Sequence, residues 1–214
     1  MKLGEIKIQS LMLIFPSESL EYGKNNVVEV VFNLKSNPSY AQYLSASVGA
    51  INRAFSIIES EGLSGLDVMT LKSVKSKREG GYTVFDLSEQ REISQVQGVY
   101  FNTYQDKISV DFYVAGNLLY VKGNINGEKI TLEYLKKIEK ISHESDDNRE
   151  ILFDYGIEEQ IPYYVKADLI FAENQEESDR ARSLFENALA RLKNMRECHL
   201  NTRTAYSLRG DFSG

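Results

Sequence analysis

The sequence contains one cysteine, two histidines, three prolines and no tryptophan among its 214 residues. A single cysteine, Cys198, excludes a disulfide framework and any CxxC-type zinc or redox site, and it fits a reducing compartment. The longest unbroken apolar run near the start, Leu11 to Phe15, has five residues, whereas about 20 are needed to cross a bilayer. We therefore expect no transmembrane helix, no signal peptide and no membrane partner.

Motifs that carry enzyme chemistry are also missing, since GxGxxG, GxxxxGK[ST], GxSxG and HExxH do not occur. Cys198 and His199 are neighbours whose side chains point apart on most backbones, and zinc needs three or four ligands. The other histidine, His143, lies in an acidic segment. The pairs Asp146-Asp147 and Glu158-Glu159 resemble the acid pair of a glycoside hydrolase, but their like-charged surroundings favour a hydrated loop. We expect no catalytic, cofactor-binding or metal-binding residue, and no enzyme.

Positive charge is not concentrated anywhere in the chain. The net charge of -6 arises from 31 acids and 25 bases, and the segment from Ser142 to Gln160 carries seven of the acids and a single base. A nucleic-acid-binding protein needs a basic stripe, because its affinity for phosphates comes largely from counterion release. We expect no sequence-specific binding to nucleic acid.

The chain has 214 residues, of which 42% are hydrophobic, so it can form a buried core in one domain or in two small ones.

Apolar periodicity predicts helices near the start of the chain. From Ser39 to Glu61 apolar and small residues recur at steps of three and four, with Asn37-Pro38 suited to the start and Gly62 to the end. Leu3 to Phe15 alternates in part like a strand, but it also carries a helical stripe, and we predict a helix. Val27 to Leu34 is rich in valine and is compatible with a short strand or with part of a helix.

The middle of the chain changes to strand-like patterns. Short runs rich in β-branched and aromatic residues alternate with turn residues, which is typical of an antiparallel sheet, a small sandwich or a barrel. The predicted strands are Asp67–Val74, Tyr82–Leu87, Ile93–Phe101, Lys107–Val114, Leu118–Val121 and Lys129–Leu135. The predicted turns are Gly80-Gly81, Gln105-Asp106, Gly116-Asn117 and Asn126-Gly127.

The last part of the chain is predicted to return to helix. After an acidic, solvated linker, a helical stripe runs from Ile157 to Ala172, with Pro162 tolerable only in the first turn. Asn174 and Glu177 form a capping pattern that opens a further helix. The predicted inner face of that helix consists of Ala181, Leu184, Phe185, Ala188 and Leu192.

These patterns predict an α+β fold in which helices from both ends of the chain form a bundle and an antiparallel β-domain is inserted between them. We predict an N-terminal helical part at 1–66 and the β-domain at 67–141. An acidic linker with the C-terminal helices occupies 142–196, and an extended polar tail occupies 197–214.

The order of several segments resembles the head-to-tail adaptor proteins of tailed phages, also called connector, neck or tail-tubular-like proteins. An early helix holds Ile51-Asn52-Arg53-Ala54, and the entry to the β-domain carries Phe85-Asp86-Leu87, although Ser88 stands where the family usually has proline. The resemblance continues in the three segments Ile130–Lys137, Glu159–Leu169 and Ala181–Ala190. It covers roughly Tyr40 to Asn194.

The resemblance implies a structural virion protein rather than an enzyme. In such proteins a helical bundle lines a twelve-membered ring of identical copies, the β-domain projects outward, and DNA passes through the lumen. The implied partners are the portal protein, a tail, stopper or tail-terminator protein, and further copies of the chain. The implied location is the virion neck, after assembly in the cytoplasm of the bacterial host.

The polar tail is the predicted partner-binding segment, because the resemblance implies a C-terminal segment that reaches toward the portal. Arg203, Tyr206, Arg209 and Phe212 are of the residue types that dominate interface hot spots, whereas a frayed terminus is the alternative interpretation. Two other functions stay open for the whole chain. One is a β-domain that binds carbohydrate or a host surface, and the other is a tail-completion protein that also forms a ring.

Overall fold

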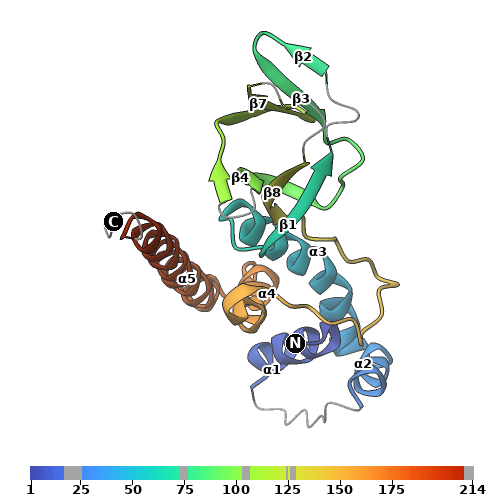
Figure 1. Ribbon diagram of the computed structural model, residues 1–214. Coiled ribbons are helices and arrows are strands. Elements are labelled where there is room, and N and C mark those ends of the chain that lie inside the picture. Colours follow the sequence, from blue (N-terminus) through green and yellow to red (C-terminus); the bar gives the residue numbers. More distant parts are fainter. Residues whose placement is uncertain (17–25, 73–76, 103–106, 124, 126–128, 210–214) are drawn as a thin grey trace. The chain divides into compact units, whose positions relative to one another are not determined.

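The computed structural model describes residues 1–16, 26–72, 77–102, 107–123, 125 and 129–209 (Figure 1). Within these residues the chain is mixed α+β, with five α-helices and two antiparallel sheets. The chain folds into two compact units. We call Met1–Leu63 together with Glu139–Gly214 the helical unit, and Ser64–Ile138 the β-unit.

The helical unit begins with helices α1 (Leu3–Ile14), α2 (Val27–Lys35) and α3 (Pro38–Ser60). The prediction of helix for α1 and α3 is confirmed, and α2 is a helix rather than a strand. Val27, Val31 and Leu34 are buried at steps of four and three, so packing of one helical face outweighs the strand preference of valine. At the start of α3 the Asn37 side chain accepts a hydrogen bond from the Ser39 N–H at 3.0 Å, which satisfies a helix N-terminus.

The chain returns to the helical unit at Glu139, and its next helices are the 3-10 helix η2 (Asp154–Gln160), α4 (Ile161–Ile170) and α5 (Gln175–Arg209). Pro162 lies in the first turn of α4, as predicted. Helix α4 packs against α1, α3 and α5 (Figure 1). The predicted cap of α5 is confirmed, because the Glu177 N–H donates to Asn174 Oδ1 at 3.1 Å and the Asn174 amide donates back to Glu177 at 3.3 Å.

Two predictions about α5 are wrong. Leu184 is 49% exposed, whereas Leu189 is buried and completes the inner face with Ala181 and Phe185. The predicted extended tail from residue 197 is helical as far as Arg209. Residues 175–209 contain neither proline nor glycine and Gly210 follows them, so the signals that end a helix come later than the loss of apolar periodicity.

The β-unit contains two four-stranded sheets whose neighbouring strands are all antiparallel within the described residues. The first sheet has the order β1-β8-β4-β5, and the second has the order β2-β3-β7-β6. The strands are β1 (Leu66–Lys72), β2 (Lys77–Glu79), β3 (Tyr82–Asp86), β4 (Ile93–Asn102), β5 (Lys107–Ser109), β6 (Phe112–Ala115), β7 (Leu118–Lys122) and β8 (Lys129–Lys136).

The predicted single strand Lys107–Val114 is two strands, β5 and β6, which belong to different sheets. At the crossing, the Val110 N–H donates to the Val99 carbonyl of β4, while the Asp111 carbonyl accepts from the Lys122 N–H of β7, both at 2.9 Å. Apolar patterning cannot reveal this break, because backbone bonding rather than side-chain type decides which sheet each half joins. Strand β2 was not predicted, since Lys77–Glu79 is polar throughout.

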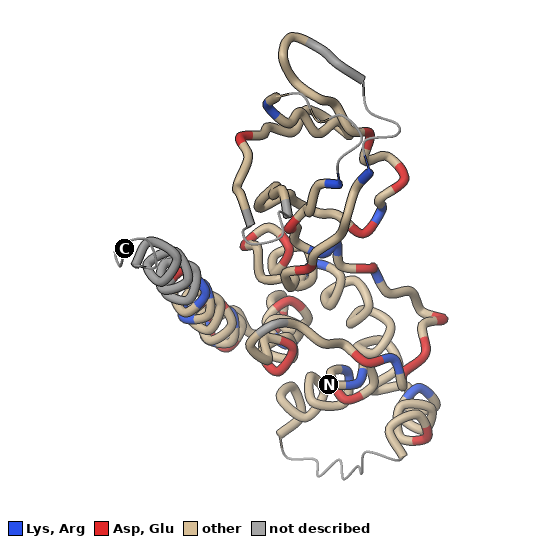
Figure 2. Tube along the Cα trace, in the orientation of Figure 1, with Lys and Arg blue, Asp and Glu red and all other residues tan. Residues whose placement is uncertain are grey.

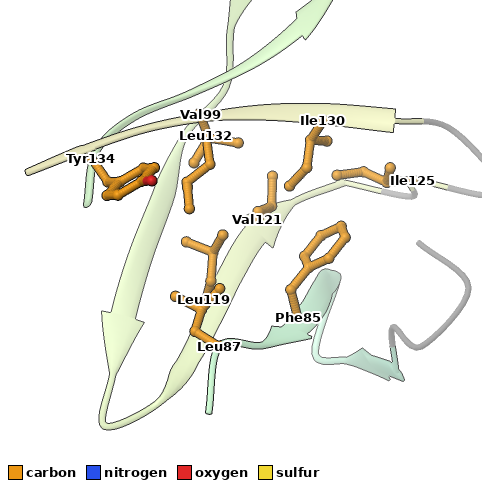
Figure 3. Close-up of a cluster of buried hydrophobic side chains, with 9 residues drawn as sticks. All are labelled: Phe85, Leu87, Val99, Leu119, Val121, Ile125, Ile130, Leu132 and Tyr134. Atoms are coloured by element: carbon orange, nitrogen blue, oxygen red, sulfur yellow. The ribbon is translucent and has the colours of Figure 1, made fainter. Parts of the chain in front are cut away.

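The core of the β-unit lies between its two sheets (Figure 3). Val99, Ile130, Leu132 and Tyr134 come from β4 and β8 and face side chains of β3 and β7, among them Phe85, Leu119 and Val121. Both sheets therefore have an apolar inner face and an outer face, as in a small sandwich. The register of β4 against β8 shifts twice, between Ile93 and Gln95 and between Val96 and Gly98, which marks β-bulges.

Candidate functional site

Asn52, in the middle of α3, holds the chain where it re-enters the helical unit. Its side-chain amide donates to the Ile141 carbonyl at 2.8 Å, and its side-chain oxygen accepts from the Ile141 N–H at 2.9 Å. Lys140 Nζ donates to the Asn52 carbonyl at 3.0 Å and also bonds to the Ser56 hydroxyl. The side chain of Asn52 thus bonds to both backbone groups of Ile141.

Arg53, the next residue, links α3 to α4. Its guanidinium bonds to both carboxylate oxygens of Asp168, with Nε at 3.2 Å from Oδ1. The hydrogen bond to Asp168 raises the pKa of Arg53 above its ordinary value. Two segments on which the resemblance rests, one in α3 and one in α4, are therefore joined by a bidentate ion pair.

The N-terminal end of α1 contacts residues 147–149 of the acidic segment that follows the β-unit (Figure 2). We call this contact the clasp. Lys7, only 2% exposed, forms an ion pair with Asp147 at 2.6 Å, and the exposed Lys35 approaches the other oxygen of that carboxylate at 3.5 Å. The Leu3 and Gly4 N–H groups donate to the carbonyls of Arg149 and Asp147, both at 2.9 Å. Because these contacts satisfy helix N-terminal donors, the segment is part of the folded structure.

The prediction of a solvated linker is therefore wrong for two of its acids. Asp147 and Glu158 are each 8% exposed, and Glu158 accepts a hydrogen bond from the Phe153 N–H at 3.3 Å. Asp146 and Glu159 are exposed, as a hydrated loop requires. The sequence could not reveal the difference, because the partner of Asp147 lies 140 residues away.

The clasp is tightly packed around Gly4. A Cβ atom at Gly4 would collide with the Val27 side chain and would lie 3.2 Å from Asp147 Cβ and from its carbonyl oxygen. We expect Gly4→Ala to lower the free energy of unfolding by about 1–3 kcal/mol through overpacking. Urea denaturation measures the change.

Gly49→Ala is the matched control for Gly4→Ala. At Gly49, in α3, a Cβ atom meets only the flexible Arg53 guanidinium at 3.4 Å. Alanine is favoured over glycine within a helix by up to about 1 kcal/mol, so this variant should be as stable as the parent or more stable. Equal losses in the two variants would show that the clasp is not the cause.

The predicted partner-binding residues lie at the far end of α5. Arg203, Tyr206 and Arg209 occupy its last turns, and Phe212 lies outside the described residues. Steps of three residues place the first three positions on neighbouring parts of one side of a helix. Closer to the body of the unit, α5 is anchored at the end of α3, because Lys193 pairs with Glu61 at 2.8 Å and Arg196 donates to the Gly62 carbonyl.

Three tyrosines form a cluster on the outer face of the second sheet of the β-unit, and we call this cluster the tyrosine face. Tyr113 and Tyr120 are paired across β6 and β7, with their rings stacked at a centroid distance of 4.5 Å and an angle of 5°. The Tyr82 ring meets the Tyr113 ring edge-on at 5.3 Å. Tyr113 is 46% exposed. Sequence patterns do not reveal this cluster, because it depends on the register of three strands.

Metal-binding clusters are absent from the part of the chain that the structure describes. There, no group of three His, Cys, Asp or Glu side chains could hold a metal ion. His143 is exposed, and the side chains of Cys198 and His199 are not among those described. Over the same residues, lysines and arginines are interspersed with acids (Figure 2). Within the described residues, no helix is long and apolar enough to cross a membrane.

In comparisons with known proteins, the chain matches no family model and no curated protein.

Proposed function

We propose that this protein is a structural component of a phage or prophage virion, an adaptor ring that joins the portal vertex to the tail. In this proposal the helices from both ends of the chain form one bundle, and the β-unit is an insertion that projects from it. Copies close a ring by cyclic symmetry, with a dodecamer as the implied number, and the ring leaves a lumen for DNA. The tail, stopper or tail-terminator protein binds the opposite side.

The observation that carries this proposal is the course of α5. Its first part is packed through Ala181, Phe185 and Leu189 and anchored by Arg196, after which the helix continues to Arg209. In this proposal the part of α5 that follows Arg196 contacts another subunit. The pairing of Arg53 with Asp168 adds support, because it joins two of the segments that resemble adaptor proteins.

The proposed contact with the portal is made by Arg203, Tyr206, Arg209 and Phe212. Guanidinium groups would meet carboxylates between portal subunits, and the aromatic rings would fill apolar pockets. This assignment predicts that the end of α5 is dispensable for folding and necessary for attachment.

Truncation after Glu197 tests that prediction. The variant keeps Lys193 and Arg196, so we expect a cooperative melt like that of the parent, together with loss of co-sedimentation with portal rings from the same genome. The triple variant Arg203→Ala/Tyr206→Ala/Arg209→Ala should lose attachment as well. Arg191→Ala, at an exposed arginine in the same helix, is the control and should bind normally. If the truncated protein bound portal rings at full strength, the end of α5 would not be the portal-binding segment.

We propose as a second candidate that the β-unit binds carbohydrate or a host surface. The tyrosine face favours it, because partly exposed aromatic rings on a sheet offer flat apolar surfaces with hydroxyl groups at their edges.

The second candidate predicts a spectroscopic response to neutral sugars. Since the chain has no tryptophan, its fluorescence comes from tyrosine, and stacking of a sugar near the tyrosine face should change its intensity. If the sugar stacks on the tyrosine face, Tyr113→Ala should abolish the change, whereas Tyr163→Ala, in α4, should preserve it. A response that persists unchanged in Tyr113→Ala would exclude the tyrosine face as the binding surface.

A further inference from the structure

A pocket of about 390 Å³ opens in the β-unit, and its described lining includes no residue of the tyrosine face. Its walls come from the turn after β3, the start of β4, the edge strand β6 and the turn between β6 and β7. The volume falls in the range of about 300–1,000 Å³ that is usual for small-molecule sites. It suits one or two sugar rings or a short piece of peptide.

The described residues that line this pocket are uncharged. Its floor includes Ile93, Val96 and Phe112, which pack against the core of the β-unit. Its rim carries the side-chain amides of Gln90, Gln95 and Asn117. Among the described residues that line the pocket, not one is acidic or basic, although 26% of the whole chain is charged.

Backbone hydrogen bonds fix the rim of the pocket, and the side-chain amides on the rim are available to a ligand. The Leu87 N–H donates to the Asn117 carbonyl at 2.8 Å, and the Gln90 N–H donates to the Leu87 carbonyl at 2.9 Å. Within the described part of the chain, the side-chain amides of Gln90, Gln95 and Asn117 take part in no hydrogen bond. One of the bulges of β4 lies beside Gln95, and bulges re-aim side chains next to binding sites.

We propose that this pocket binds one unit of a neutral saccharide. Each side-chain amide both donates and accepts hydrogen bonds, as sugar hydroxyls do, and the apolar floor matches the C–H face of a sugar ring. An ionised ligand would lose its hydration without meeting an opposite charge. The inference rests on the second candidate function for the class of ligand only. It replaces the tyrosine face with the pocket as the binding site, so the two sites predict opposite results for Tyr113→Ala.

An extended peptide is the competing occupant, because β6 is an edge strand without charge or proline. Strand β6 has four residues, however, and in an antiparallel strand alternate residues direct their backbone groups to the same side. About two residues would therefore be available to an added strand. The three side-chain amides on the rim therefore offer more hydrogen-bonding groups to a sugar than the edge of β6 offers to a peptide.

Nuclear magnetic resonance of the full chain tests the proposal. The probes are the neutral tetrasaccharides of glucose and of N-acetylglucosamine, with tetragalacturonate as the charged comparison. We expect the neutral probes to shift the side-chain amide signals of Gln90, Gln95 and Asn117, and tetragalacturonate to leave them unchanged. Asn117→Ala and Gln95→Ala should each weaken binding about 5- to 10-fold, as expected for one lost hydrogen bond.

Tyr113→Ala separates the possible results, because it alters the tyrosine face and no lining residue of the pocket. Normal binding by this variant supports the proposal. Neutral-sugar binding that is lost in Tyr113→Ala, with the pocket amides unmoved, would overturn the pocket and keep the second candidate function. No shift with either neutral probe at millimolar concentration would overturn both. Shifts confined to the β6 backbone with an extended peptide would assign the site to strand addition instead.

Discussion

Replacing Asp147 with asparagine is expected to lower the free energy of unfolding by about 3–5 kcal/mol, because it leaves the Lys7 ammonium buried without a countercharge. Lys7 is 2% exposed, so water cannot replace the lost partner. The carbonyl of residue 147, which accepts from the Gly4 N–H, is unchanged by the substitution. Chemical denaturation with the parent as reference measures the loss.

Two further variants isolate the charge effect at Asp147. Asp146→Asn removes an exposed carboxylate from the adjacent residue and should change stability little. Lys7→Met/Asp147→Leu removes both charges and should recover most of the stability, since apolar groups can replace a buried ion pair at little cost. If the double variant were as unstable as Asp147→Asn, the geometry of the segment rather than its charge would be responsible.

Excision of residues 64–138 is expected to leave a helical unit that folds and melts cooperatively. Its helices supply their own packing, since α4 contacts α1, α3 and α5. Asn52 holds Ile141, and Asn52 and Gly62 are ten residues apart, which corresponds to about 15 Å along the direction of α3. A glycine-serine linker of about eight residues, with a reach of about 26 Å, can therefore join the ends.

Circular dichroism with thermal melting measures the result of the excision. A spectrum that is richer in helix than that of the parent, with one cooperative transition, is expected. Adding Phe55→Ala, at a fully buried residue of α3, should lower the transition temperature and so show that the transition reports native packing. Little helix and no cooperative melt would mean that the β-unit shares one core with the helices.

The sequence predicts the elements well where local signals coincide. Helix α3 combines apolar periodicity with Asn37-Pro38 at its start, and α5 begins at a cap formed by Asn174 and Glu177. It predicts less where the outcome depends on distant partners. The break at Val110–Asp111 depends on bonds to β4 and β7, and the end of α5 depends on helix-breaking residues rather than on periodicity.

The candidate sites were harder to predict than the fold. Asp147 resembles any other acid in an acidic run until Lys7, 140 residues away, is placed beside it. Tyr82, Tyr113 and Tyr120 come together only through the register of three strands. Gln90, Gln95 and Asn117 become one rim only when a turn, a bulged strand and a second turn meet. In each case tertiary pairing, not residue type, creates the site.

The clasp between α1 and the segment around Asp147 also affects how the chain folds during synthesis. The N-terminal helices emerge first, but their partners, the acidic segment and α4, emerge only after the whole β-unit has been made. At about 5–20 residues per second, the 75 residues of Ser64–Ile138 take on the order of 4–15 s. During that interval the apolar faces of α1 and α3 that later meet α4 are exposed to the cell, and the β-unit has time to fold first.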